Sequence, residues 1–245
     1  MNWKKITIIV LDALIALYLV LAVTVFNKPD EQDNICTDVQ VKIEQEAVEG
    51  FLTSEKVKQL LNRARLYPVG QSMDRINTRQ IEETLLGNDL IEYVECYKTQ
   101  HGHLCLNIKQ RVPVVRVMAQ NGEDYYVDSY GEAMPHTGYT CNLIVATGDI
   151  SKSYAAKWLV PMANVILADD FWKNQVEQIN VLSDGSVEIV PRVGDHIAYL
   201  GQPTGLHNKF NRLRKFYRYG LSQAGWNKYN RISVEFDNQI ICKRK

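Results

Sequence analysis

A single long apolar stretch near the N-terminus constrains this chain more than any other feature. Residues Ile6 to Phe26 read ITIIVLDALIALYLVLAVTVF and contain one charged residue, Asp12. As a helix the stretch would be about 31 Å long, which matches the roughly 30 Å hydrocarbon core of a bilayer. A cleavable signal peptide is the main alternative, but its apolar region is only about 7–15 residues and ends in small residues. Here Val25-Phe26-Asn27-Lys28-Pro29 follows, so the sequence predicts a retained transmembrane helix.

The charges beside this stretch predict its orientation. Lys4 and Lys5 precede it, whereas Asp30, Glu31 and Asp33 follow. Because basic flanks stay in the cytoplasm, we expect a cytoplasmic N-terminus and an exported remainder. A carboxylate inside the bilayer costs free energy. Asp12 is therefore either tolerated near the interface or protonated, or it contacts a polar group on a partner's membrane helix.

Composition predicts that the exported remainder folds. Of 245 residues, 46% are hydrophobic and 23% charged, which is ordinary for a globular protein. The formal net charge is zero, so nucleic-acid binding is not expected. The C-terminal part is nevertheless basic: from His207 onward two acidic residues, Glu235 and Asp237, accompany ten basic ones. This pattern fits a solvated basic surface, or a surface for an acidic partner or anionic lipid.

After a polar linker at 28–37, residues 38–117 are predicted to form a small α+β unit. Val39, Val41 and Ile43 alternate as in a strand. A helix capped by Thr53 follows, with Val57, Leu60, Leu61 and Ala64 at helical spacing. A second helix begins at Asn77, with Gln80 completing a capping-box-like pair and Ile81 and Leu85 as its buried stripe. Two strands, 94–98 and 104–108, then form a hairpin around His101-Gly102, pairing Val94 with Ile108 and Cys96 with Leu106.

Residues 118–245 are predicted to form a larger β domain with flanking helices. We expect a strand at 125–128 with a turn ending at Gly131, and a helix at 151–167 with Ala155, Leu159, Met162 and Ile166 on one side, broken or started by Pro161. A hairpin over 176–190 and a strand at 197–200 follow. A helix capped by Thr204 then ends at Gly225, and strands at 232–236 and 239–243 complete the domain. The fold class is therefore α+β, with mainly antiparallel sheets because hairpin signals dominate.

Several motifs resemble a known family. The order of elements in 38–117, and its ending Gln110-Arg111-Val112-Pro113-Val114, resemble a POTRA domain. Together with Val127-Asp128-x-x-Gly131, Leu200-Gly201, Lys209-Phe210-x-x-Leu213 and the closing stretch Ile232 to Ile240, the chain resembles the FtsQ/DivIB cell-division proteins of bacteria. Its cytoplasmic tail is shorter than in many members.

The resemblance implies a non-catalytic scaffold in the inner membrane at the division site, without cofactor or metal. It would bind small single-pass proteins of the FtsB and FtsL type and regulate septal peptidoglycan synthesis. A terminal hairpin offers an open strand edge, to which a partner segment can add by main-chain hydrogen bonds. We therefore assign partner binding to Arg231, Ile232, Val234, Phe236, Asn238, Ile240 and Cys242. The apolar members with inward orientation would equally serve to complete the domain's own sheet.

Other functions have weaker support in the sequence. It contains no G-x-S-x-G, H-E-x-x-H, P-loop or Rossmann glycine motif. The hairpin turn that carries His101 and His103 contains no cysteine, and no acidic ligand is close to it in sequence. The adjacent Asp169 and Asp170 do not by themselves indicate a glycosidase. A peptidoglycan hydrolase remains a remote alternative. A POTRA-bearing protein of envelope polypeptide export is a nearer one, although such proteins usually carry several POTRA units or a membrane barrel.

Overall fold

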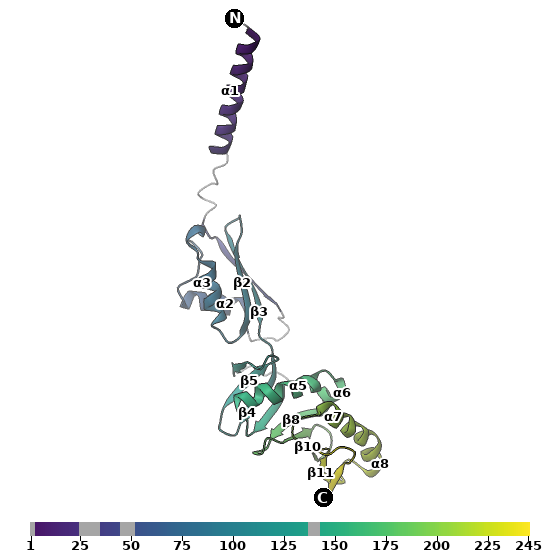
Figure 1. The fold of residues 1–245 in the computed structure, drawn as a ribbon. Coiled ribbons are helices and arrows are strands. Elements are labelled where there is room, and N and C mark those ends of the chain that lie inside the picture. The colour runs from purple at the N-terminus through teal and green to yellow at the C-terminus, as the bar shows by residue number, and fades with distance from the viewer. Residues whose placement is uncertain (1–2, 25–34, 45–51, 137–142) are drawn as a thin grey trace. The chain divides into compact units, whose positions relative to one another are not determined.

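The computed structural model describes residues 3–24, 35–44, 52–136 and 143–245. Its first element, α1 (Trp3–Thr24), is one continuous helix (Figure 1). Within it, Ile6–Val23 has a mean hydropathy of 2.8 and no buried side chains. Its length and composition allow it to span a membrane. Val25 and Phe26, at the end of the predicted span, lie outside the described residues.

The chain divides into two compact units, residues 1–42, 54–85 and 94–107 in one, and 43–53, 86–93 and 108–245 in the other. The POTRA-like elements are β1 (Asp38–Glu44), α2 (Ser54–Arg63), the short 3₁₀ helix η2 (Met73–Arg75), α3 (Thr78–Leu86), β2 (Ile91–Lys98) and β3 (His103–Gln110). The three strands form a sheet in the order β1-β3-β2. The predicted strand-helix-helix-strand-strand order is confirmed, with η2 as an addition.

The caps of the two POTRA helices follow local chemistry. Asn77 Oδ1 accepts a hydrogen bond of 3.1 Å from the Gln80 amide, as the capping signal predicted. α2 ends earlier than expected, because Arg65 adopts a left-handed φ of 57°. Ala64, predicted as the last apolar position of this helix, therefore lies beyond it and is exposed. Val57 and Leu61 are fully buried.

The β2–β3 hairpin agrees with the predicted pairing. The Thr99 amide donates to the His103 carbonyl across the turn, and Gly102 has a φ of 73°. Asn107 Nδ2 lies 3.4 Å from Glu95 Oε2 on the facing strand. The Cys96 thiol is buried and free.

The C-terminal domain is built on a nine-stranded sheet in the order β12-β11-β10-β9-β8-β7-β4-β5-β6. Its strands are β4 (Pro113–Ala119), β5 (Asp124–Asp128), β6 (Ala133–Pro135), β7 (Ile144–Gly148), β8 (Val176–Val181), β9 (Val187–Pro191), β10 (Ile197–Gly201), β11 (Tyr229–Ser233) and β12 (Ile241–Arg244). β4 pairs with β5 and β7, so the domain boundary expected after residue 117 would cut this strand.

Most neighbouring strands in this sheet are antiparallel, as predicted, but β4–β7, β7–β8 and β10–β11 are parallel. Parallel neighbours require a crossover connection. The first crossover helix runs through α4 (Lys152–Tyr154), the π-helical η3 (Ala155–Leu159) and α5 (Val160–Leu167), and α6 (Asp170–Gln175) follows it before β8. The π-helical turn ends two residues before Pro161, which has no amide hydrogen to donate.

The second crossover runs through α7 (Leu206–Lys215), π-helical η4 (Phe216–Leu221) and α8 (Ser222–Ala224). Thr204 is not its cap. Gly205 occupies that position with a left-handed φ of 60°, and no side chain caps the helix. Thr204 therefore lies one residue too early to bond the first turn. Gly225 ends the helix as predicted, with a φ of 92°.

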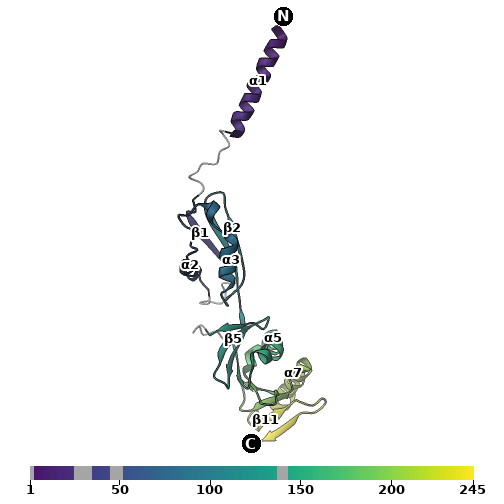
Figure 2. The ribbon, with the colours of Figure 1, turned by 60° about the vertical axis from the view of Figure 1, so that its left-hand side comes forward.

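The two crossovers pack side by side and bury one face of the sheet (Figure 2). Trp172, Phe210 and Leu213 meet the inward-facing residues of the central strands in one continuous core. Ala155, Leu159, Met162 and Ile166, the predicted stripe of the first crossover, are all fully buried there. The strand order places β12 at the border of this sheet, and the candidate site lies there.

Candidate partner-binding edge

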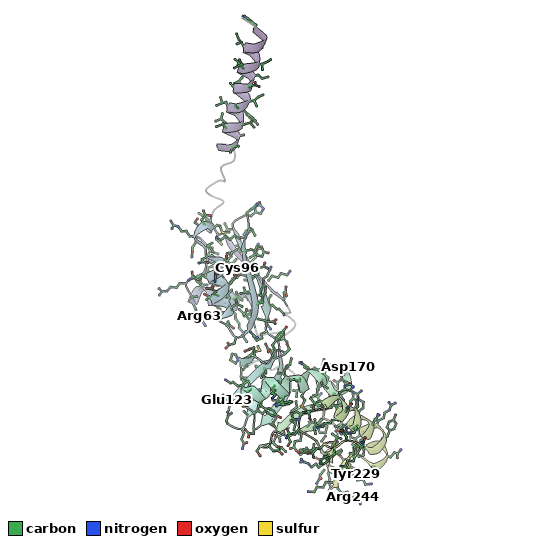
Figure 3. The ribbon with its side chains drawn as sticks, in the orientation of Figure 1. Arg63, Cys96, Glu123, Asp170, Tyr229 and Arg244 are labelled. Atoms are coloured by element: carbon green, nitrogen blue, oxygen red, sulfur yellow. The ribbon has the colours of Figure 1, made fainter. Side chains whose placement is uncertain are left out.

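β12 forms the outermost strand of the nine-stranded sheet. It pairs with β11 on one side, with Ser233 opposite Ile241 and Tyr229 opposite Arg244, and the second pair is seen at the C-terminal end in Figure 3. On its other side no strand of the described residues pairs with it. An edge strand of this kind exposes backbone N–H and C=O groups that another strand can bind.

Two of the residues assigned to partner binding belong to the core. Ile232 and Val234 are 0% exposed and contact the domain's hydrophobic cluster. β11 is an inner strand, so alternate side chains point toward the crossover helices. A direct partner contact by these two side chains is therefore wrong, and they complete the domain's own sheet.

The other assigned residues lie around the hairpin that joins β11 to β12. Phe236 is 50% exposed, and Asn238 is exposed with a left-handed φ of 65°. Ile240 and Cys242 are half-buried against the core, and burial raises the pKa of the Cys242 thiol. Ile241 is 52% exposed. Sequence reasoning missed it because only its neighbours fitted the expected alternation.

Arg231 is held from two sides. Its Nη1 lies 3.0 Å from Glu188 Oε2, and its guanidinium carbon lies 4.5 Å from the centre of the Tyr199 ring. The side chain is 40% exposed, whereas that of Glu188 is 9% exposed. Arg231 therefore presents part of its charge beside β12 from a fixed position.

A chain of polar contacts leads to Glu188 across the sheet face that the helices leave open. Gln178 Nε2 donates to Thr147 Oγ1 at 2.7 Å, and Thr147 donates to Asn180 Oδ1 at 3.1 Å. Asn180 Nδ2 then donates to Glu188 Oε1 at 3.1 Å. These contacts satisfy a half-buried polar face and fix the carboxylate that holds Arg231.

A second arginine ties the hairpin turn to the crossover helix. Arg212 Nη1 lies 2.7 Å from Asp237 Oδ1, and its Nη2 donates to the Val234 carbonyl at 2.7 Å. A hollow of about 510 Å³ opens beside this contact, lined by Arg212, Lys215, Phe216, Tyr219, Gly220, Asn238, Gln239 and Ile240. The sequence did not predict this hollow, because its walls come from a helix and a turn that are distant along the chain.

Comparison with known proteins decides the family. The family described as FtsQ/DivIB, C-terminal related, matches residues 112–243. The chain belongs to this family. A POTRA-like domain matches residues 34–109, and no curated protein sequence matches the chain. The suspected resemblance to FtsQ/DivIB is thus confirmed, and with it membership of a bacterial cell-division family.

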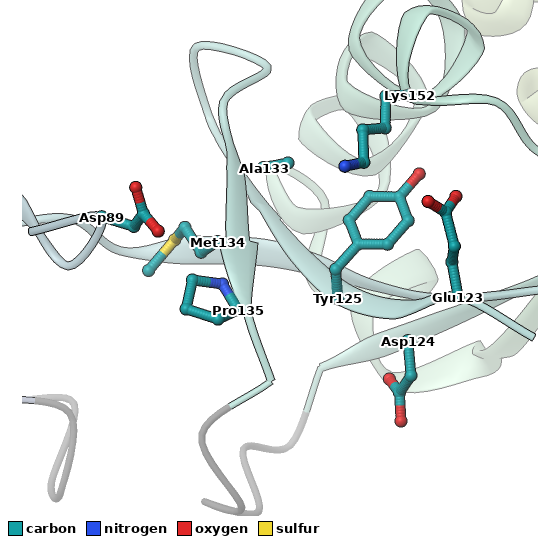
Figure 4. Close-up of a pocket in the computed structure, with 8 residues that line it drawn as sticks. All are labelled: Asp89, Glu123, Asp124, Tyr125, Ala133, Met134, Pro135 and Lys152. Carbon is teal, nitrogen blue, oxygen red and sulfur yellow. The ribbon is translucent and has the colours of Figure 1, made fainter.

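FtsQ/DivIB and POTRA domains are generally non-catalytic scaffolds. A second hollow in this FtsQ/DivIB chain nevertheless brings several titratable side chains together. It has a volume of about 430 Å³ and includes Asp89, Glu123, Asp124, Tyr125 and Lys152 in its lining. Figure 4 shows Lys152 and Glu123 flanking the Tyr125 ring, with Asp124 directed away from it.

Asp124 in this hollow does not have the environment of a general acid. Arg116 binds Asp124 through two contacts, of 2.9 and 2.6 Å, and this hydrogen bonding holds the pKa of Asp124 below its usual value. A general acid requires a raised pKa. The geometry therefore gives no support to the hydrolase alternative at this place.

The remaining predicted positions belong to elements other than β11 and β12. Asp12 is exposed on α1. His103 Nδ1 lies 3.3 Å from Thr37 Oγ1 in the POTRA-like hairpin. Among the described residues no group of three His, Cys, Asp or Glu side chains is placed to hold a metal ion.

Proposed function

We propose that this FtsQ/DivIB-family chain is a non-catalytic, single-pass scaffold of the division machinery. Its β12 edge binds an extended segment of an FtsB- or FtsL-type partner, and through that partner it regulates the septal peptidoglycan synthase complex. The observation that carries the proposal is the position of β12 at the border of the sheet, where no strand in the described part of the chain pairs with its outer side.

The chemistry of the edge suits an added strand. A partner strand would satisfy the outward backbone groups of β12, and its side chains would contact the exposed Ile241 on one face. At the hairpin end, the hollow between Arg212 and Ile240 can accept an apolar side chain of the partner. Main-chain bonds would then give affinity, and the hollow would select the partner.

Charge favours an acidic partner segment. Arg231 is partly exposed beside the edge, and Lys243 and Arg244 are exposed on β12 itself. Complementary charge of this kind raises the association rate more than the affinity. We therefore expect partner binding to slow as salt concentration rises.

The proposal includes membrane topology. α1 would anchor the chain with its N-terminus in the cytoplasm and both folded units outside. A reporter enzyme fused after Lys245 and active only outside the cytoplasm tests this directly. Fluorescent tagging in dividing cells tests the division role: enrichment at mid-cell supports it, whereas uniform envelope staining favours polypeptide export.

The edge is tested by a matched pair of variants. Ile241→Gln removes an exposed apolar side chain from β12, and Met118→Gln removes one from β4, six strands away on the same sheet. We expect the first to weaken co-purification of the FtsB-type partner about fivefold and the second to leave it unchanged. Equal capture by both variants, with intact circular dichroism, would rule out the β12 edge.

A further inference from the structure

A different face of the second crossover helix borders another hollow, of about 360 Å³. It is lined by Phe171, Arg214, Tyr217, Arg218 and Trp226; we name it the Trp226 pocket. It shares no lining residue with the hollow beside the hairpin turn. None of its residues was predicted as a site, and none belongs to β12.

The base of the Trp226 pocket is aromatic and fixed. The Tyr217 side chain is 2% exposed, and its ring centre lies 5.2 Å from that of Trp226. The Tyr217 hydroxyl lies 2.8 Å from His196 Nε2. Phe171 is 40% exposed at the rim, so the pocket offers rings both below and beside an occupant.

The rim of the pocket carries positive charge. Arg214 forms an ion pair with Asp169, and its guanidinium carbon lies 5.0 Å from the centre of the Phe171 ring. Arg218 is exposed and forms no ion pair with any carboxylate of the described residues. Its guanidinium instead lies 5.6 Å from the Tyr219 ring. The apolar base of the pocket therefore lies between Arg214, which is paired with Asp169, and Arg218, whose charge can pair with an occupant.

We propose that the Trp226 pocket binds an aromatic side chain presented by an acidic segment of a partner protein. The ring would pack on Trp226, which the buried Tyr217 supports, and a neighbouring carboxylate would pair with Arg218. The volume suits one aromatic side chain with its backbone, and aromatic and arginine groups together are typical anchors of protein interfaces. The ten basic residues against two acidic ones after His207 favour an acidic occupant over a neutral one.

This site does not depend on strand addition at β12. A flat anionic lipid surface would meet the exposed Arg218 but would leave the aromatic base in contact with water. A protein segment can fill the hollow and neutralise its rim at once. The inference can therefore fail while the proposed function stands, and the reverse also holds.

The test uses the full chain in neutral detergent micelles and a fluorescently labelled pentapeptide, phenylalanine flanked by two glutamates on each side. Fluorescence anisotropy should show at least fivefold tighter binding of this peptide than of two matched peptides, one with serine for phenylalanine and one with glutamines for the glutamates. Absence of binding, or equal binding of all three, would overturn the proposal, and tighter binding to phosphatidylglycerol vesicles alone would assign the surface to lipid.

Variants locate the contact. Arg218→Glu should lower the affinity for the acidic aromatic peptide about tenfold, and Phe171→Ala about threefold. Lys215→Glu is the matched control, because it makes the same charge change on the same helix but lines the other hollow; it should change the affinity less than twofold. Ile241→Gln should leave it unchanged. Equal effects of the Arg218 and Lys215 variants would reduce the interaction to general charge attraction and contradict a built pocket.

Discussion

Arg231 on β11 forms an ion pair with Glu188 on β9, although β10 lies between the two strands. The carboxylate is almost fully buried, whereas the guanidinium reaches solvent beside the free border. The pair therefore connects the interior polar contacts of the sheet to its exposed edge. Because the two side chains differ in burial, substitutions of Arg231 and Glu188 should change the free energy of unfolding by different amounts.

Arg231→Ala should lower the free energy of unfolding by about 1–3 kcal/mol, because it leaves a buried carboxylate without its cation. The estimate is below that for a fully buried pair because water reaches Arg231. Glu188→Gln should cost less, since the amide oxygen can still accept from Asn180. Denaturant unfolding of the full chain in micelles measures both. The exposed pair of Arg192 and Glu177 is the control, and Arg192→Ala should cost less than about 1 kcal/mol. A larger loss for Glu188→Gln than for Arg231→Ala would contradict this account.

Ile232 and Ile241 give a second contrast. Ile232→Ala should lower the free energy of unfolding by about 2–5 kcal/mol, because it opens a cavity in the core. Ile241→Ala, at a half-exposed position, should cost less than about 1 kcal/mol. Thermal unfolding of the two variants measures both losses of stability. Similar losses at the two positions would mean that β11 and β12 do not face the core and solvent as described.

His196 should make stability depend on pH. Its side chain is 4% exposed, and burial lowers the pKa of the imidazole below 6.5, partly opposed by the adjacent Asp195. Its Nε2 faces the Tyr217 hydroxyl, the Trp226 ring packs nearby, and Lys245 binds Asp195. The unfolded chain then binds this proton more readily than the folded one. Stability should be complete above pH 6.5 and should fall toward the lowered pKa, by no more than about 1.4 kcal/mol for each pH unit.

Urea unfolding at pH 7.5 and pH 5.5 measures this effect. In His196→Phe the change in stability between the two values should be smaller than in the unaltered chain. His207 is exposed, and His207→Gln should leave the change as it is. The same pH dependence in both variants would assign it to other groups.

The sequence predicted the parts of the fold that local signals determine. The apolar span, the Asn77 cap, the hairpin around Gly102 and the buried stripe of the first crossover all depend on residues close together in the chain. The parallel pairing of β10 with β11 was not predicted, since it joins strands separated by an entire helix. The prediction that Thr204 caps the second crossover helix was wrong. Threonine before an apolar stripe usually caps a helix, but Gly205 occupies the cap position here.

The candidate site was predicted less well for a related reason. Period-two alternation identified Ile232 and Val234 as apolar and aligned, but alternation alone does not say which face of a strand is covered. The helices decide that, and they cover these residues. The two hollows on the second crossover helix arise only when helix, turn and loop meet in space.

The border strand consists of nearly the last residues of the chain, and its inner neighbour is reached only through the second crossover helix. β11 pairs with β10 and β12 pairs with β11, so β12 joins the sheet through a strand that follows this helix in the chain. If β12 recruits the partner as proposed, a variant that unfolds the second crossover helix should lose that capture even with every β12 residue intact. The binding border would then serve as a check that the whole domain has folded.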